Sequence, residues 1–139
     1  MMAANTAPIY SRLGDIQWGA SALTTANTAK DGTGTVLTVF TADATNGGRV
    51  ETIIFRAAGT NVATVARIFI NNGSTNATAA NNILYGELTL PSTTLSETTQ
   101  LADQRLSLGF ALPAGYKINV VIGTAVAAGY YVSVIGGKY

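Results

Sequence analysis

The sequence predicts an all-β protein, a single domain over residues 1–139 in which antiparallel strands form a β-sandwich or a barrel. Three observations predict this class: apolar and polar residues alternate in segment after segment, helical periodicity is nearly absent, and turn residues separate the segments at intervals of about ten residues. With 47% apolar residues, the 139-residue chain can bury a core without disulfides. We expect the sandwich.

The first half of the chain contains four candidate strands, which are apolar over much of their length. Residues 9–18 are a weak candidate interrupted at Gly14, and residues 35–41 and 50–57 follow. Residues 62–71 carry apolar side chains on both faces: Ala66, Ile68 and Ile70 on one, and Val65, Arg67 and Phe69 on the other. A strand of this kind is either central in a sandwich or covered on its outside by a neighbour.

The second half contains four strands with clear alternation, which is typical of one buried and one solvated face. They cover residues 84–90, 105–110, 117–122 and 131–135. Asn-Gly pairs at residues 46–47 and 72–73 supply the positive φ that tight turns need. Residues 21–30 and 92–103 are each expected to hold at most a turn or two of helix.

The composition argues against catalysis. The chain has no histidine and no cysteine, and only eight basic and seven acidic residues, whereas most catalysis near neutral pH uses imidazole, thiolate or paired carboxylates. Asp31 and Asp43 each stand alone in their loops, so we expect neither a metal nor a cofactor. The arginines are scattered, which is unlike a nucleic-acid binder. No apolar run is long enough for a membrane-spanning helix, and the N-terminus shows no signal peptide.

The low charge indicates a surface that a partner covers. Charged residues are 11% of the chain, against about 25% in an average domain, and so few charges protect poorly against association. Because the strand at residues 62–71 is also apolar on both faces, we expect a homodimer or higher oligomer. Residues 1–30 carry apolar side chains that a free tail would not need, so we expect an extended arm along a neighbouring subunit or another partner, with Tyr10 and Trp18 as anchors. An alternative for Trp18 is a plug at one end of the sandwich. The interface candidates are Ile9, Tyr10, Ile16, Trp18, Tyr130, Tyr131 and Tyr139.

Residues 7–19, 59–73, 112–116 and 123–125 resemble the small cement (decoration) proteins of tailed-phage capsids. More narrowly, the chain is similar to the jelly-roll cement protein of certain short-tailed phages. The resemblance implies a jelly roll that binds the outside of an assembled icosahedral shell, bridges neighbouring major capsid proteins and resists the pressure of packaged DNA. It also implies a dimer or trimer placed at a symmetry axis.

The function expected from the sequence is therefore structural: a virion protein on the capsid exterior, whose partners are the major capsid protein and further copies of itself. A tail or head-fibre adhesin that binds host glycans is the alternative, and a small hydrolase is a third. Glycan binding predicts a solvent-facing aromatic cluster with nearby Asn and Asp. The function of a cement protein predicts instead a broad, flat and neutral contact surface for another protein.

Overall fold

The computed structural model describes residues 11–139, which form eight β-strands and one short 3-10 helix. The strands and their bounds are β1 Leu13–Trp18, β2 Leu37–Thr41, β3 Gly48–Ala57, β4 Thr64–Asn71, β5 Asn82–Leu90, β6 Gln104–Leu112, β7 Lys117–Ile122 and β8 Tyr130–Lys138. The 3-10 helix η1 spans Ala79–Asn81. All eight predicted strands are present, and residues 21–30 and 92–103 contain no helix. No helix within residues 11–139 is long and apolar enough to cross a membrane.

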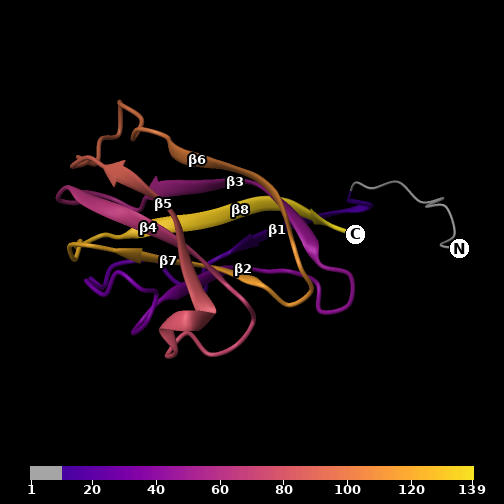
Figure 1. Cartoon of the computed structure of the whole chain (residues 1–139). Coiled ribbons are helices and arrows are strands. Elements are labelled where there is room, and N and C mark those ends of the chain that lie inside the picture. The colour runs from indigo at the N-terminus through magenta and orange to yellow at the C-terminus, as the bar shows by residue number, and fades with distance from the viewer. Residues whose placement is uncertain (1–10) are drawn as a thin grey trace, which may run out of the picture.

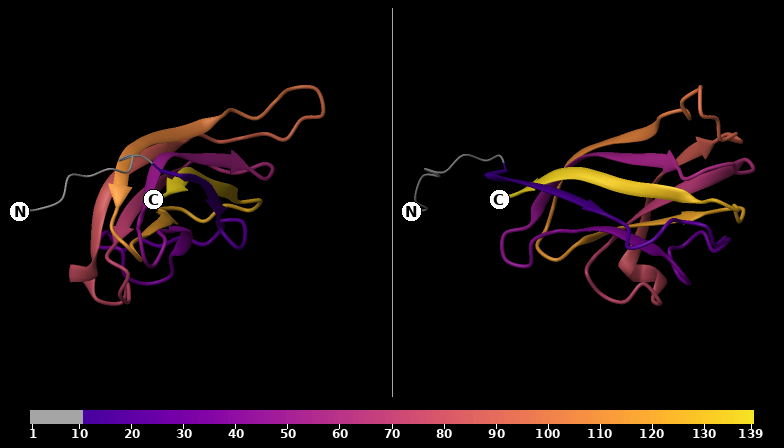
Figure 2. Two further views of the ribbon diagram at one scale, coloured as in Figure 1. Left: turned by 90° about the vertical axis from the view of Figure 1, so that its right-hand side faces the viewer. Right: turned by 180° about the vertical axis from the view of Figure 1, so that it is seen from behind.

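The strands form two four-stranded antiparallel sheets that stack as the layers of a sandwich (Figure 1). One sheet has the order β1-β8-β3-β6 and the other the order β2-β7-β4-β5. Figure 2, right, shows the first sheet from behind, with β1, β8, β3 and β6 in succession. This arrangement, in which β1 pairs with β8, β2 with β7, β3 with β6 and β4 with β5, is the jelly roll. The predicted fold class is confirmed.

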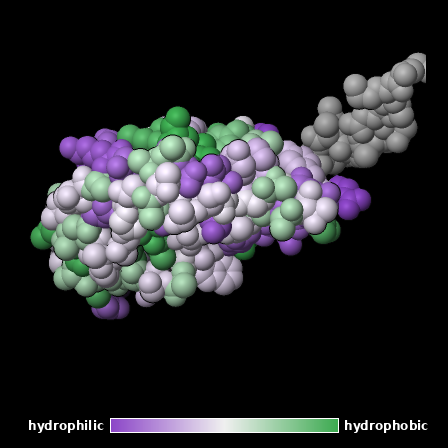
Figure 3. Space-filling model, turned by 60° about the horizontal axis from the view of Figure 1, so that its bottom comes forward, coloured by the Kyte–Doolittle hydropathy of each residue, from purple (hydrophilic) through white to green (hydrophobic). Residues whose placement is uncertain are grey.

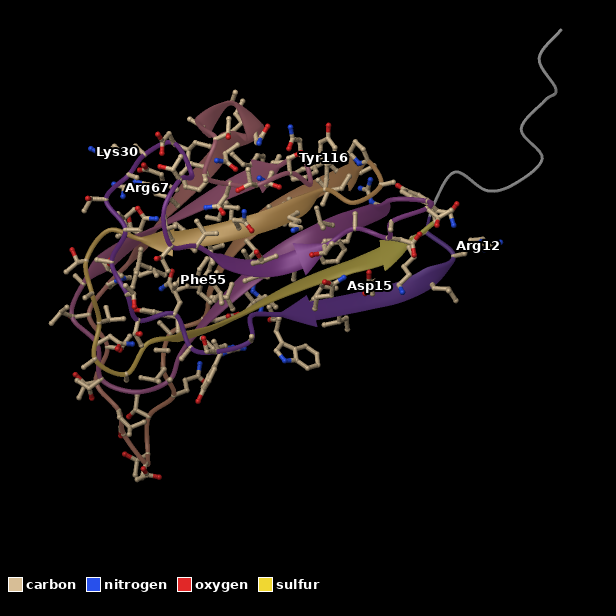
Figure 4. All side chains as sticks on the ribbon, turned by 90° about the horizontal axis from the view of Figure 1, so that it is seen from below. Arg12, Asp15, Lys30, Phe55, Arg67 and Tyr116 are labelled. Carbon is tan, nitrogen blue, oxygen red and sulfur yellow. The ribbon has the colours of Figure 1, made fainter. Side chains whose placement is uncertain are left out.

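The core fills the space between the sheets because alternate residues of each strand point inward. Ile53 and Phe55 of β3 and Ile118 and Val120 of β7 are fully buried, and Phe55 is labelled in Figure 4. In β3 the alternation shifts between Val50 and Ile53, which are both buried, because a bulge there interrupts the pairing of β3 with β6 and with β8.

The outer side of the β2-β7-β4-β5 sheet is largely covered by the chain itself. Phe69 of β4 and Val121 of β7 point away from the main core, yet both are almost fully buried. The segments 25–34 and 72–82 lie at this side: Ala26 bridges to Ile122, and the Asn76 amide donates to the backbone of Gly32 at 3.1 Å. The second apolar face of β4 is thus covered without a partner molecule, and β4 gives no reason to expect an oligomer.

Much of the segment expected as an arm belongs to the sandwich. β1 pairs with β8 along its whole length, from Leu13 opposite Lys138 to Trp18 opposite Ser133. Leu23 is buried and forms a bridge with Tyr130. Residues 13–26 are therefore not an arm on a neighbour, because their backbone groups are paired within this chain. Residues 1–10 lie outside the described part.

Gln17 closes the corner of the sandwich between the edge strands β1 and β2. Its side-chain amide nitrogen donates to the Thr41 carbonyl, and its amide oxygen accepts the Thr41 N–H, both at 2.9 Å. One side chain thus occupies both backbone groups of an edge-strand residue, which otherwise remain open to pairing with another chain.

A candidate interaction surface

An apolar face lies on the outer side of the β1-β8-β3-β6 sheet. Trp18, Tyr131, Ile16 and Ile135 are exposed by 70, 62, 59 and 37% respectively, and half-buried Ile54 of β3 lies beside them. We call these five residues the apolar face. Three adjacent strands contribute to it, so its side chains stand on a hydrogen-bonded, rigid support (Figure 2, right).

The strand register makes the apolar face continuous. Ile16 lies opposite Ile135, and Ser133 lies between Trp18 on one neighbouring strand and Ile54 on the other. Trp18 and Tyr131 are diagonal neighbours across β1 and β8, a spacing that large aromatic side chains can bridge. Contiguous exposed apolar residues of this kind mark contact sites for other macromolecules more often than isolated ones do.

Ion pairs occupy the other half of the same outer surface. Arg56 lies opposite Tyr131 and is 3.6 Å from Asp103, which also pairs with Arg105. Arg49 pairs with Glu51, which raises the pKa of the Arg49 guanidinium, with a smaller contribution from Tyr139. These charges compensate one another locally. The surface is therefore divided into an apolar part on β1 and β8 and a nearly neutral polar part on β3 and β6.

The structure brings together three of the seven residues expected at an interface: Ile16, Trp18 and Tyr131. Tyr139 is half-buried at the end of the chain, beyond the apolar face. Ile9 and Tyr10 lie outside the described residues. Trp18 does not plug the sandwich, since it is the most exposed of the large apolar side chains in residues 11–139.

Tyr130 was wrongly expected at the surface. It is 1% exposed and lies in the core, because it is an inward-facing residue of β8 while Tyr131 faces outward. Ile54 and Ile135 were missed as site residues. The alternation of Tyr131, Ser133 and Ile135 already placed Ile135 on the outer face, whereas placing Ile54 beside it required the pairing of β3 with β8.

Within residues 11–139, no group of three His, Cys, Asp or Glu side chains is placed to hold a metal ion. Asp31 accepts hydrogen bonds from the hydroxyl and the backbone N–H of Thr33, which lower the pKa of its carboxyl. Asp43 accepts the backbone N–H groups of Asn46 and Thr45, and its pKa is lowered for the same reason. Both carboxylates hold their own turns in shape.

The fold and this surface define the class of a jelly-roll sandwich with an exposed apolar face on its β1-β8-β3-β6 sheet. The chain matches no protein-family model, and no curated protein matches it significantly in sequence. Among solved structures, it is similar to a chain of the cyanophage Pam1 capsid asymmetric unit, at 14% identity and a TM-score of 0.47. The alignment covers 100% of this chain and 94% of that chain. A likeness of this size does not by itself assign a function.

Proposed function

We propose that this protein is a structural virion protein that binds the outer surface of an assembled phage capsid and stabilises it by bridging major capsid proteins. The apolar face is the observation that carries the proposal. Trp18 and Tyr131 offer large side chains at low conformational cost, and β1, β8 and β3 hold them in fixed positions. The choice of a capsid as the partner follows from the resemblance of the sequence to cement proteins.

The chemistry around the two aromatic rings favours a protein partner over a glycan. A binding site for a sugar combines an aromatic side chain, against which the sugar packs, with polar groups that form hydrogen bonds to the sugar hydroxyls. Here most of the surrounding residues on the face are aliphatic, namely Ile16, Ile54 and Ile135; the polar neighbours are Ser133 opposite Trp18 and Arg56 opposite Tyr131. Aliphatic neighbours cannot satisfy sugar hydroxyls, whereas they suit an apolar protein contact.

The sparse charge of the molecule agrees with a neutral contact. Figure 3 shows one face on which strongly hydrophilic residues are scattered among pale and apolar ones. Four ion pairs form within residues 11–139, and three of them lie on the sheet that bears the apolar face. A surface with compensated charges binds through shape and apolar contact, so its affinity for a shell should depend weakly on salt.

The test is binding to shells assembled from the cognate major capsid protein. Replacing Trp18 and Tyr131 together by Ser should weaken co-sedimentation with shells at least about 30-fold, since a buried aromatic anchor contributes about 2 kcal/mol or more. The matched control is Ile83→Ser, because Ile83 of β5 is 65% exposed on the other sheet. Both variants should melt like the parent protein, because these side chains lie outside the core.

Unchanged shell binding by the Trp18/Tyr131 double variant would overturn the assignment of the contact to the apolar face. Failure of the unaltered protein to bind any such shell, combined with binding to host-surface glycans, would instead favour the adhesin function.

A further inference from the structure

A second feature lies on the opposite outer surface of the sandwich: a polar hollow of about 170 Å³. Thr38 of β2, Asn119 and Lys117 of β7 and Asn71 of β4 contribute strand residues to it, and the loop 73–76 forms its wall. These strands belong to the sheet β2-β7-β4-β5, so the hollow and the apolar face lie on different sheets. A molecule attached by its apolar face therefore keeps the hollow free for another ligand.

Two hydrogen-bond donors in the hollow are unused by the protein. Asn119 is 3% exposed, and its amide oxygen accepts the Thr38 hydroxyl at 2.7 Å. Its amide nitrogen has no acceptor among residues 11–139, and the Lys117 ammonium has neither a hydrogen bond nor an ion pair within the same range. Among residues 11–139 only the Tyr130 hydroxyl is fully buried without a partner, so the Asn119 amide nitrogen is open to solvent in the hollow, where an acceptor of a ligand can replace water.

The walls of the hollow are held by asparagine side chains. The Asn71 amide donates to the Asn82 side-chain oxygen and accepts the N–H of Gly73, both at 2.8 Å. Asn76 donates to the carbonyls of Gly32 and Gly34, which ties the loop to the segment before β2. These bonds fix the hollow before any ligand arrives, and a preformed site loses less entropy on binding.

We propose that the hollow binds a single acidic monosaccharide. The ammonium of Lys117 and the amide nitrogen of Asn119 can both donate to the carboxylate. The hydroxyls of Ser74 and Thr75 can donate to the sugar oxygens, although the Thr75 oxygen already accepts the N–H of Ala77 at 3.2 Å. The hollow is smaller than the range of about 300–1,000 Å³ typical of sites for drug-sized ligands, so it admits one ring rather than a chain. A single cation matches the single negative charge of a uronic acid.

The experiment is an NMR titration of the isotope-labelled full chain with glucuronate, galacturonate and N-acetylneuraminate, each up to about 50 mM. This range covers the weak affinities that one sugar ring can reach, because a Kd of 1 mM corresponds to only about 4 kcal/mol. We expect saturable shifts of the Asn119 side-chain amide and of residues 73–76 with at least one acidic sugar. Glucose serves as the neutral sugar, and acetate and phosphate serve as anions without a sugar ring.

Lys117→Gln should weaken the binding about tenfold or more, because it removes a charge-assisted hydrogen bond. Lys138→Gln is the matched control, since it removes the same charge from β8 on the other sheet. Three results would overturn the proposal: no saturable shift with any acidic sugar, equal binding of acetate or phosphate, or full affinity in Lys117→Gln. The apolar face takes no part in sugar binding. The NMR titration can therefore succeed where the shell-binding test fails, and it can fail where the shell-binding test succeeds.

Discussion

The hydroxyl of Tyr130 is buried among the core residues without a hydrogen-bond partner in residues 11–139. Asn61 is already engaged, since its amide oxygen accepts the N–H groups of Ala128 and Gly129 and its amide nitrogen donates to the Gly129 carbonyl. Burial also raises the pKa of the phenol above its ordinary value. At this position the aromatic ring stabilises the fold, and the hydroxyl costs free energy.

Tyr130→Phe is therefore expected to leave the free energy of unfolding unchanged or to raise it by about 1 kcal/mol. Urea denaturation measures this. Tyr85→Phe is the control, because the Tyr85 hydroxyl donates to the Ser107 carbonyl at 3.2 Å, and its loss should cost about 0.5–1 kcal/mol. A loss of stability in Tyr130→Phe as large as that in Tyr85→Phe would contradict the account of an unpartnered hydroxyl.

The same substitution has a pH signature. The tyrosine in the unfolded chain ionises near pH 10, whereas Tyr130 in the folded protein stays protonated to higher pH. Above about pH 10 the unfolded state then binds fewer protons, so the free energy of unfolding falls as pH rises. Tyr130→Phe should reduce the slope of the free energy of unfolding against pH above about pH 10. Equal slopes in the variant and the parent protein would contradict a raised pKa of Tyr130.

At the scale of elements, β1 is the strand whose role differs most from the sequence-based expectation. It lies at the edge of its sheet and runs antiparallel to β8 (Figure 4, where Arg12, just before β1, and Asp15 of β1 are labelled). Its Gln17 side chain also joins it to β2. The strand thus contributes both to the stability of the sandwich and, through Ile16 and Trp18, to the apolar face.

Deleting residues 1–19 should destabilise the sandwich rather than leave it folded. Six cross-strand pairs with β8 are lost, at about 0.5 kcal/mol each, together with the bonds of Gln17. The free energy of unfolding should fall by roughly 3 kcal/mol or more, measured by thermal melting with circular dichroism. A chain that begins at Ser11 is the control, because it keeps all of these pairs. Equal melting of the two truncated chains would show that β1 contributes nothing to stability.

At the scale of the whole molecule, the two outer surfaces of the sandwich differ. The β1-β8-β3-β6 sheet exposes the apolar face, while the β2-β7-β4-β5 sheet is largely covered by the segments 25–34 and 72–82. The loop between β5 and β6 projects from the body of the molecule (Figure 2, left). An asymmetric distribution of this kind suits a protein that attaches by one side. Self-association into a dimer or trimer stays a prediction.

Shells that carry this protein should withstand higher temperature than shells that lack it. A ligand that binds only the assembled state stabilises that state by mass action, and the gain grows with the free concentration of the ligand. Calorimetry or light scattering of shells with added protein should show the rise, and the Trp18/Tyr131 double variant should not produce it at the same concentration. Identical melting of shells with and without the unaltered protein would refute the stabilising role.

The sequence by itself determined the all-β class and the positions of most strands, because alternation and Asn-Gly turns are local signals, while it left the first strand a weak candidate. It also placed Tyr131 and Ile135 on one side of β8. Residues 117–122 match β7 in full, while the other strands differ at their ends by a few residues.

Tertiary structure decided which of the two sides of each strand is solvated, and that choice separates Tyr130 from Tyr131. It buried Phe69 beneath distant segments of the chain, made residues 13–18 an edge strand, and placed Ile54 beside Ile135 through the β3–β8 register. It also brought Asn119 and Lys117 to the loop 73–76. These features depend on contacts between residues far apart in the sequence, and local periodicity carries no information about such pairs.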